Sequence, residues 1–215
     1  LPTHDVVRFR RICRLCHRSA NANLKQLFNI YRAYLWYFDD PDAFRILQAR
    51  TGAIVSGSFA LQFVARTYYE DSDLDVFVHY GAHETVGSWL WSQGYHFLSP
   101  LHQARKAYRN ALKSITTTHS RQRGYSEGSL GVLNFGMERF GWRRKVQVIV
   151  TMENPMTIIM QFHSTCVLNF ITYEAAYCLY PEATLVHHTT LALQAPVSRV
   201  RYALMKYQDR GFTCL

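Results

Sequence analysis

The most constraining feature of this sequence is the order of elements in residues 51–80, TGAIVSGSFALQFVARTYYEDSDLDVFVHY. A short apolar run at 53–55 predicts a strand, and the small residues at 56–58 predict a turn after it. Residues 59–66 repeat their apolar side chains with helical spacing, and residues 73–78 alternate as a strand does. The sequence therefore predicts a strand, a tight turn, a helix and a second strand in one compact unit.

Two groups within this unit carry chemistry, a glycine-serine pair and an aspartate pair. Gly57 and Ser58 stand where the helix begins, and a helix N-terminus offers unpaired N–H groups and partial positive charge to a phosphate. Alternation along the second strand places Asp73 and Asp75 on one face, and divalent cations prefer carboxylate oxygen. A phosphate site beside paired carboxylates predicts metal-dependent phosphoryl chemistry.

The order and spacing of these pairs resemble the signature of the nucleotidyltransferase fold, a superfamily that includes polymerase beta, CCA-adding enzymes and poly(A) polymerases. That signature is Gly-Ser or Gly-Gly, a helix, and then Asp-x-Asp or Asp-x-Glu in a strand. Here fourteen residues separate Gly57-Ser58 from Asp73-Leu74-Asp75. The wording SGSFALQF…DSDLDVFV, with KVQVIV, FHSTCVLNFIT and KYQDRGF further on, also resembles a group of fungal proteins with this fold. The likeness covers roughly residues 43–212.

The resemblance implies an α+β fold in which helices flank a mixed sheet. It also implies that Asp73 and Asp75 hold Mg²⁺ or Mn²⁺, and that the Gly-Ser pair seats the phosphates of a nucleoside triphosphate. A hydroxyl on RNA, protein or a small molecule would then take the nucleoside monophosphate, and pyrophosphate would leave. Arg66 or a cation from residues 105–123 would balance the triphosphate charge, and the sequence leaves that choice open.

One position departs from the family pattern. A third carboxylate usually stands on the strand beside the Asp-x-Asp pair, and the matching candidate catalytic residue in KVQVIVT is Gln147. A neutral amide can offer its carbonyl oxygen to a metal ion, but it adds no negative charge. Three explanations stay open: two carboxylates suffice, Glu153 replaces the third, or the chain is a degenerate relative that binds nucleotide or nucleic acid without catalysis.

The charge of the chain favours an anionic partner. The formal net charge is +9, from 24 Lys and Arg against 15 Asp and Glu. No Asp or Glu stands between Glu84 and Glu127, whereas six cations do, namely Arg105, Lys106, Arg109, Lys113, Arg121 and Arg123. We therefore predict that this segment binds nucleic acid, with RNA favoured, and a generally basic surface is the alternative. The oligomeric state is left open.

Signals for a membrane or for secretion are missing from the sequence. No apolar run reaches the ~18 residues of a membrane span, and the charged, apolar and small-residue blocks of a signal peptide do not occur in order. Five cysteines are too few for a secreted disulfide scaffold. We therefore expect an intracellular protein, cytoplasmic or nuclear, with no membrane partner. The chain starts at Leu1 without a Met, which leads us to expect a piece of a longer protein.

Residues 1–42 are predicted to form basic and aromatic helices that pack on a nucleotidyltransferase-like domain of residues 43–215, in a single compact unit. Residues 3–19 and 20–38 each have the spacing of one helix, and the inward side chains of the first would be Val6, Val7, Ile12 and Leu15. The arginines of the first would stay in water or contact nucleic acid. Its motif Cys13-x-x-Cys16-His17 matches haem attachment or half of a zinc site, but we interpret the two cysteines as small apolar residues on a basic helix.

Overall fold

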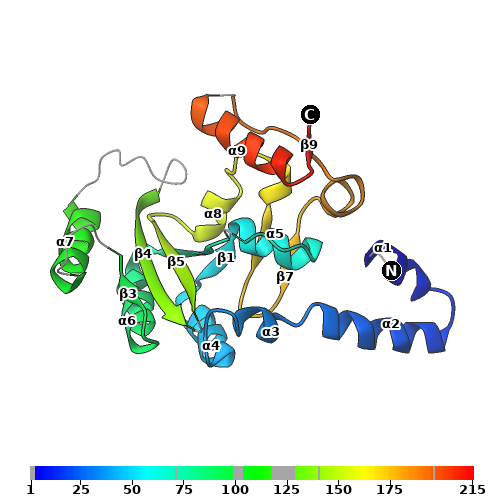
Figure 1. The fold of residues 1–215 in the computed structure, drawn as a ribbon, viewed down its shortest axis with the longest axis horizontal. Helices are drawn as coiled ribbons and strands as arrows, with labels where there is room; N and C mark the ends of the chain where they lie inside the picture. The colour runs from blue at the N-terminus through cyan, green and yellow to red at the C-terminus, as the bar shows by residue number, and fades with distance from the viewer. Residues whose placement is uncertain (1–2, 71, 99–103, 118–128, 140, 196) are drawn as a thin grey trace.

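The computed structural model describes residues 3–70, 72–98, 104–117, 129–139, 141–195 and 197–215. They form the predicted α+β fold, a mixed sheet with helices packed around it (Figure 1). Within these residues the main sheet has seven strands, which are β1 (Ile54–Ser56), β2 (Leu74–His79), β3 (His96–Phe97), β4 (Ser129–Arg139), β5 (Trp142–Thr151), β6 (Asn169–Ile171) and β7 (Ala176–Cys178). Their order across the sheet is β3-β4-β5-β2-β1-β6-β7.

Nine α-helices occur in the same described ranges. They are α1 (Thr3–Phe9), α2 (Arg14–Leu27), α3 (Ile30–Tyr34), α4 (Pro41–Thr51), α5 (Gly57–Ala65), α6 (His83–Ser92), α7 (Ala104–Thr117), α8 (Pro155–Ile159) and α9 (Ser198–Asp209). Two further short strands, β8 (Thr189–Thr190) and β9 (Thr213–Cys214), pair in parallel near the C-terminus. No helix in the described part of the chain is long and apolar enough to cross a membrane.

Strand β2 lies at the centre because its side chains are buried on both faces of the sheet. Leu74, Val76 and Val78 are fully buried in one apolar cluster, which includes aromatic side chains of α3 and α4. Phe77 points to the other face and packs on Phe162 and the residues of α8. Each completely buried side chain of this kind contributes about 1.5–3 kcal/mol. The strand pairs antiparallel with β1 and parallel with β5, which fixes the residues beside its acids.

Capping residues set the entry to β1. Asp40 accepts a hydrogen bond through Oδ1 from the backbone N–H of Ala43 at 3.0 Å, and Pro41 occupies the first turn of α4. Gly52 ends the helix with a φ of 66°, a left-handed angle that glycine adopts without a Cβ penalty. These caps fix both ends of α4 and direct the chain into the sheet.

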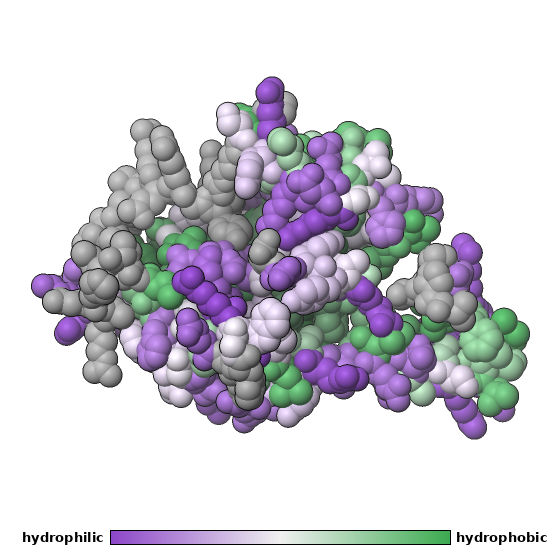
Figure 2. Space-filling model, in the orientation of Figure 1, coloured by the Kyte–Doolittle hydropathy of each residue, from purple (hydrophilic) through white to green (hydrophobic). Residues whose placement is uncertain are grey.

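The N-terminal segment corrects the prediction of two long helices. Cys13 has an extended backbone (φ −157°), so residues 3–19 divide into α1 and the start of α2, and α2 continues to Leu27. Of the side chains expected to point inward only Val6 is buried, while Ile12 and Leu15 are 70% and 74% exposed. The reason is geometric: the α1–α2 arm (residues 3–27) extends from the body of the protein (Figure 1), so its outer face has no surface to pack on. Hydrophilic and hydrophobic residues mix on this arm (Figure 2).

Candidate functional site

The turn from β1 into α5 brings a helix start against a carboxylate. Ser56 donates a hydrogen bond from Oγ to the backbone carbonyl of Asn169 at 2.6 Å, and it lies beside Asp75 in the β1–β2 register. Gly57 follows with a φ of 72°, and a Cβ built on it would overlap Oδ2 of Asp75 and lie 3.2 Å from its Cγ. Only glycine combines this backbone angle with so close an approach. Asp75 is 5% exposed, so its carboxylate is buried against the positive end of α5.

Ser58, the next residue, is held by the end of α9. Its Oγ accepts a hydrogen bond from Nη1 of Arg210 at 2.9 Å and lies 3.5 Å from the hydroxyl of Tyr207. The Arg210 guanidinium also lies 3.9 Å from the centre of the Tyr69 ring. Burial raises the pKa of Tyr207 to about 12, so its hydroxyl keeps its proton at neutral pH. The helix start is therefore bordered by a hydroxyl, a phenol and a cation.

A hollow of about 690 Å³ opens between α5, β2, α9 and the segment that follows α8. We call it the α5–α9 hollow, and its polar lining includes Gly57, Ser58, Asp75, His163 and Lys206. Figure 1 shows α5, α8 and α9 on the same side of the molecule. Small-molecule pockets usually measure about 300–1,000 Å³, so this hollow has the size for a nucleotide.

The other aspartate of the pair lines a different hollow. Asp73 lies with Trp36, Trp142 and Lys145 around a space of about 440 Å³. Its Oδ2 is 2.7 Å from Nζ of Lys145, and the two side chains are 31% and 32% exposed. Such a half-exposed ion pair contributes at most about 1 kcal/mol, so another cation can compete for Asp73. The prediction places both aspartates at one cleft. In the structure Asp75 lines the α5–α9 hollow, and Asp73 lines the other one.

Gln147 is the neighbour of Asp75 in the parallel β2–β5 register. Its Nε2 donates a hydrogen bond to Oδ1 of Asn134 on β4 at 2.7 Å, so two amides stand where the resemblance places a third acid. Glu153 is six positions beyond Gln147, after the strand has ended at Thr151, whose hydroxyl donates a hydrogen bond to the Glu153 carbonyl. Glu153 lies two residues past the end of β5, and it is not among the residues that line the α5–α9 hollow.

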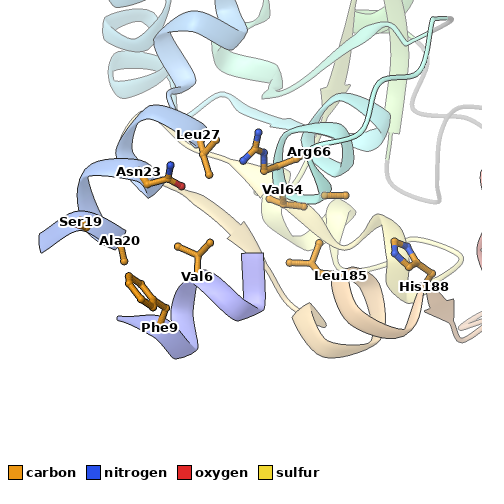
Figure 3. Close-up of a pocket in the computed structure, with 11 residues that line it drawn as sticks. Val6, Phe9, Ser19, Ala20, Asn23, Leu27, Val64, Arg66, Leu185 and His188 are labelled. Atoms are coloured by element: carbon orange, nitrogen blue, oxygen red, sulfur yellow. The ribbon is translucent and has the colours of Figure 1, made fainter. Parts of the chain in front are cut away.

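Arg66 lies far from the helix start that it was predicted to assist. It caps the C-terminal end of α5 with a φ of 56°, whereas Gly57 and Ser58 begin the helix, about 12 Å away along its axis. Its guanidinium lies 6.0 Å from the centre of the Phe28 ring. It lines a separate hollow between α5 and the α1–α2 arm, beside Val64 and Leu27 (Figure 3). Arg66 therefore lies at the opposite end of α5 from Gly57 and Ser58.

The cations that do border the helix start come from α9 and its end. Lys206 lines the α5–α9 hollow, and Arg210 contacts Ser58. The sequence around these two cations did not predict that either belongs to the site. Both lie in KYQDRGF, one of the segments that resemble the fungal group, and that resemblance was the only indication. Lys145, which holds Asp73, was also missed, although it precedes Gln147 by two residues in KVQVIVT.

The predicted nucleic-acid segment is a second basic surface. On α7, Tyr108 packs against Phe97 and Phe135 of the sheet, and Ile115 is buried. The opposite face of the helix exposes Lys106, Arg109 and Lys113. The side chain of Arg105, together with Arg121 and Arg123, lies outside the described residues. Helix α7 covers β3 and β4, so this surface is at the edge of the sheet, away from α9 (Figure 1).

The acids near the site fit a metal only together with a ligand. Among the residues that the structure describes, no three His, Cys, Asp or Glu side chains gather to hold a metal ion. Mg²⁺ is, however, often bound through one or two carboxylates plus the phosphates of a substrate. Asp75, which lines the α5–α9 hollow, fits this mode of binding, whereas Asp73 is paired with Lys145 in the other hollow.

Comparison with known proteins gives no family for the chain. No protein-family model matches the sequence, and no curated protein matches it.

Proposed function

We propose that the chain binds a nucleoside triphosphate and a divalent cation in the α5–α9 hollow and transfers the nucleoside monophosphate to a hydroxyl acceptor. The observation that carries the proposal is the packing of Gly57 against the buried carboxylate of Asp75. A helix N-terminus attracts phosphate, whereas a carboxylate beside it repels phosphate unless a cation lies between them. A helix N-terminus and a carboxylate can therefore both bind a nucleotide that carries a metal ion, the first through the phosphates and the second through the metal.

Different residues would contact the phosphates and the metal ion of this ligand. The first N–H groups of α5 and the Ser58 hydroxyl face the phosphates, and Lys206 and Arg210 balance their charge. Asp75 and Asp73 would hold Mg²⁺ or Mn²⁺, which when bound neutralises charge developing on the phosphoryl oxygens. Lys145 holds the Asp73 carboxylate in an ion pair, which a metal ion would have to replace.

A second candidate is binding without transfer, and a specific observation favours it. The Gln147–Asn134 amide pair adds no negative charge beside Asp75, and Asp73 is already neutralised by Lys145. One buried carboxylate in the hollow can hold a cation with a triphosphate, yet leave the phosphoryl oxygens too weakly stabilised for transfer. The exposed cations of α7 would then serve to hold RNA.

The test compares the native chain with Asp75→Asn, which keeps the shape of the side chain and removes its charge. Glu153→Gln is the matched control, because Glu153 is an exposed acid that is not among the residues lining the hollow. Each of the common nucleoside triphosphates is added with and without Mn²⁺; at 100 times its Kd a bound ligand stabilises by about 2.7 kcal/mol. Pyrophosphate release is then measured with RNA and protein acceptors.

The outcomes separate the two candidates. A Mn²⁺-dependent rise in melting temperature that is lost in Asp75→Asn, with pyrophosphate release, supports transfer. The same rise without pyrophosphate release supports binding alone. If no nucleotide stabilises the chain with or without Mn²⁺, or if Asp75→Asn behaves as Glu153→Gln does, both candidates are refuted.

A further inference from the structure

The first turn of α2 carries two thiols in contact. Cys13 is the N-cap residue, and Cys16 lies three positions further on. Their sulfur atoms are 3.4 Å apart, and the backbone N–H of Cys16 points to the Cys13 sulfur at 3.5 Å. Neither sulfur is buried, and the extended backbone of Cys13 turns its side chain back over the helix start.

We propose that Cys13 and Cys16 form a redox-active dithiol that exchanges with small anionic disulfides, with Cys13 as the attacking thiol and Cys16 as the resolving thiol. The inference is independent of nucleotide binding, since the pair lies on the α1–α2 arm and lines neither hollow around the aspartates. The thiolate is the reactive form of cysteine, and its reactivity depends on exposure and on positive surroundings.

The two sulfurs differ in their hydrogen bonds, which gives the pair a direction. The pKa of the Cys13 thiol is lowered, first by the hydrogen bond that the backbone N–H of Cys16 donates to its sulfur and then by the hydrogen bond between the two thiols. The pKa of the Cys16 thiol is raised, first by its hydrogen bond to Cys13. Cys13 therefore ionises first at the positive end of a 14-residue helix, and Cys16 keeps its proton until it is needed.

The positive charge around the two cysteines favours a disulfide that carries negative charge. Five exposed arginines accompany the pair within eleven residues of sequence, namely Arg8, Arg10, Arg11, Arg14 and Arg18. Asp5 is the only acid between positions 3 and 27. Such local charge attracts a disulfide that carries carboxylates, such as glutathione disulfide. The neighbours Ile12 and Leu15 are 70% and 74% exposed, so this end of the arm is open to such a molecule.

The reaction consists of two successive thiol–disulfide exchanges. The Cys13 thiolate attacks one sulfur of glutathione disulfide, forms a mixed disulfide and releases one glutathione thiolate, which takes a proton. The Cys16 thiol then loses its proton and attacks the Cys13 sulfur, which forms the Cys13–Cys16 disulfide and releases the second glutathione. Two protein thiols are oxidised to one disulfide, and one external disulfide is reduced to two thiols.

The other three cysteines serve as internal references. Burial raises the pKa of Cys166, of Cys178 and of Cys214, so each is a poorer nucleophile than Cys13. Cys166 in particular is fully buried. A reaction confined to the first turn of α2 is therefore distinguishable from general thiol oxidation in the same sample.

The experiment treats the native chain with glutathione disulfide, blocks free thiols and digests with trypsin. Cleavage after Arg11, Arg14 and Arg18 releases peptides 12–14 and 15–18, which stay joined only through a Cys13–Cys16 disulfide. We expect this joined pair in the native chain and a glutathione adduct that persists on Cys13 in Cys16→Ser. In Cys13→Ser we expect adduct formation at Cys16 to be about tenfold slower than at Cys13.

Two results would overturn the inference. One is the absence of the joined peptides when adducts accumulate at Cys166, Cys178 or Cys214. The other is equal adduct rates in Cys13→Ser and Cys16→Ser. Repeating the comparison in guanidinium chloride supplies the control for folding, because the difference between the two variants must vanish once α2 is unfolded. Melting curves of both variants check that they fold.

Discussion

Replacement of Gly57 by alanine tests the central geometry of the site. The new methyl group requires a φ of 72°, which costs about 1–2 kcal/mol for any residue with a Cβ. It would also overlap Oδ2 of Asp75, and a buried side chain that is forced to move adds about 1–3 kcal/mol. We therefore expect Gly57→Ala to lose about 3 kcal/mol, a fall in Tm of about 6–12 °C for a chain of this length.

The matched control is Gly52→Ala at the end of α4. Gly52 has a similar φ of 66°, but no heavy atom lies within 4 Å of a Cβ built on it. It therefore measures the backbone cost alone, and we expect a loss of about 1–2 kcal/mol. Both variants are compared by calorimetry and by urea unfolding.

A double variant isolates the contact with the carboxylate. If the overlap with Asp75 is the cause, Asp75→Ala makes room for the new methyl group, and the double variant Gly57→Ala/Asp75→Ala is more stable than additivity predicts by about 1–2 kcal/mol. Equal losses in Gly57→Ala and Gly52→Ala, together with strict additivity in the double variant, would refute the close packing of helix start and carboxylate.

Substitutions at α4, α7 and Tyr207 test three more contacts. Asp40→Ala removes the N-cap of α4 and should cost about 1 kcal/mol in urea unfolding, more than the exposed Asp42→Ala does; equal losses would contradict the cap. The pKa of Tyr207 is about 12 in the folded chain against an ordinary 10.0, so the unfolded chain loses this proton first. Its share of stability is intact below pH 10 and falls by roughly 3 kcal/mol toward pH 12, and Tyr207→Phe should remove most of this alkaline loss. If α7 holds single-stranded RNA, the slope of log K against log salt should weaken by about 2 when glutamine replaces its three exposed cations, Lys106, Arg109 and Lys113; an unchanged slope would exclude this face.

The sequence predicts those parts of the fold whose information is local. The apolar run at 53–55, the small residues at 56–58 and the alternation at 73–78 correspond to β1, the start of α5 and β2. Periodicity is enough there, because each element is short and buried on the face that its pattern specifies. The position of Gln147 came from the resemblance, and the parallel register of β2 and β5 places it beside Asp75.

The remaining parts of the site depend on long-range contacts that periodicity does not contain. Lys145 is 72 positions from Asp73, and Arg210 is 152 positions from Ser58. Nothing in either local pattern says which side chain meets which acid or hydroxyl. In the α1–α2 arm the local pattern correctly predicts helices but not their burial. A helix buries its apolar side chains only where another part of the protein packs on them.

From the connection between β2 and β5 we expect the parts of the site to assemble in a definite order. The contact between Gly57 and Asp75 needs only β1, α5 and β2, which follow one another directly in the chain. Gln147 can join them only after α6, β3, α7 and β4 have been synthesised, and closing so long a connection is slow. A newly made chain would thus possess its anion-attracting turn and its acid early, and would acquire the amide neighbour and the α9 cations last.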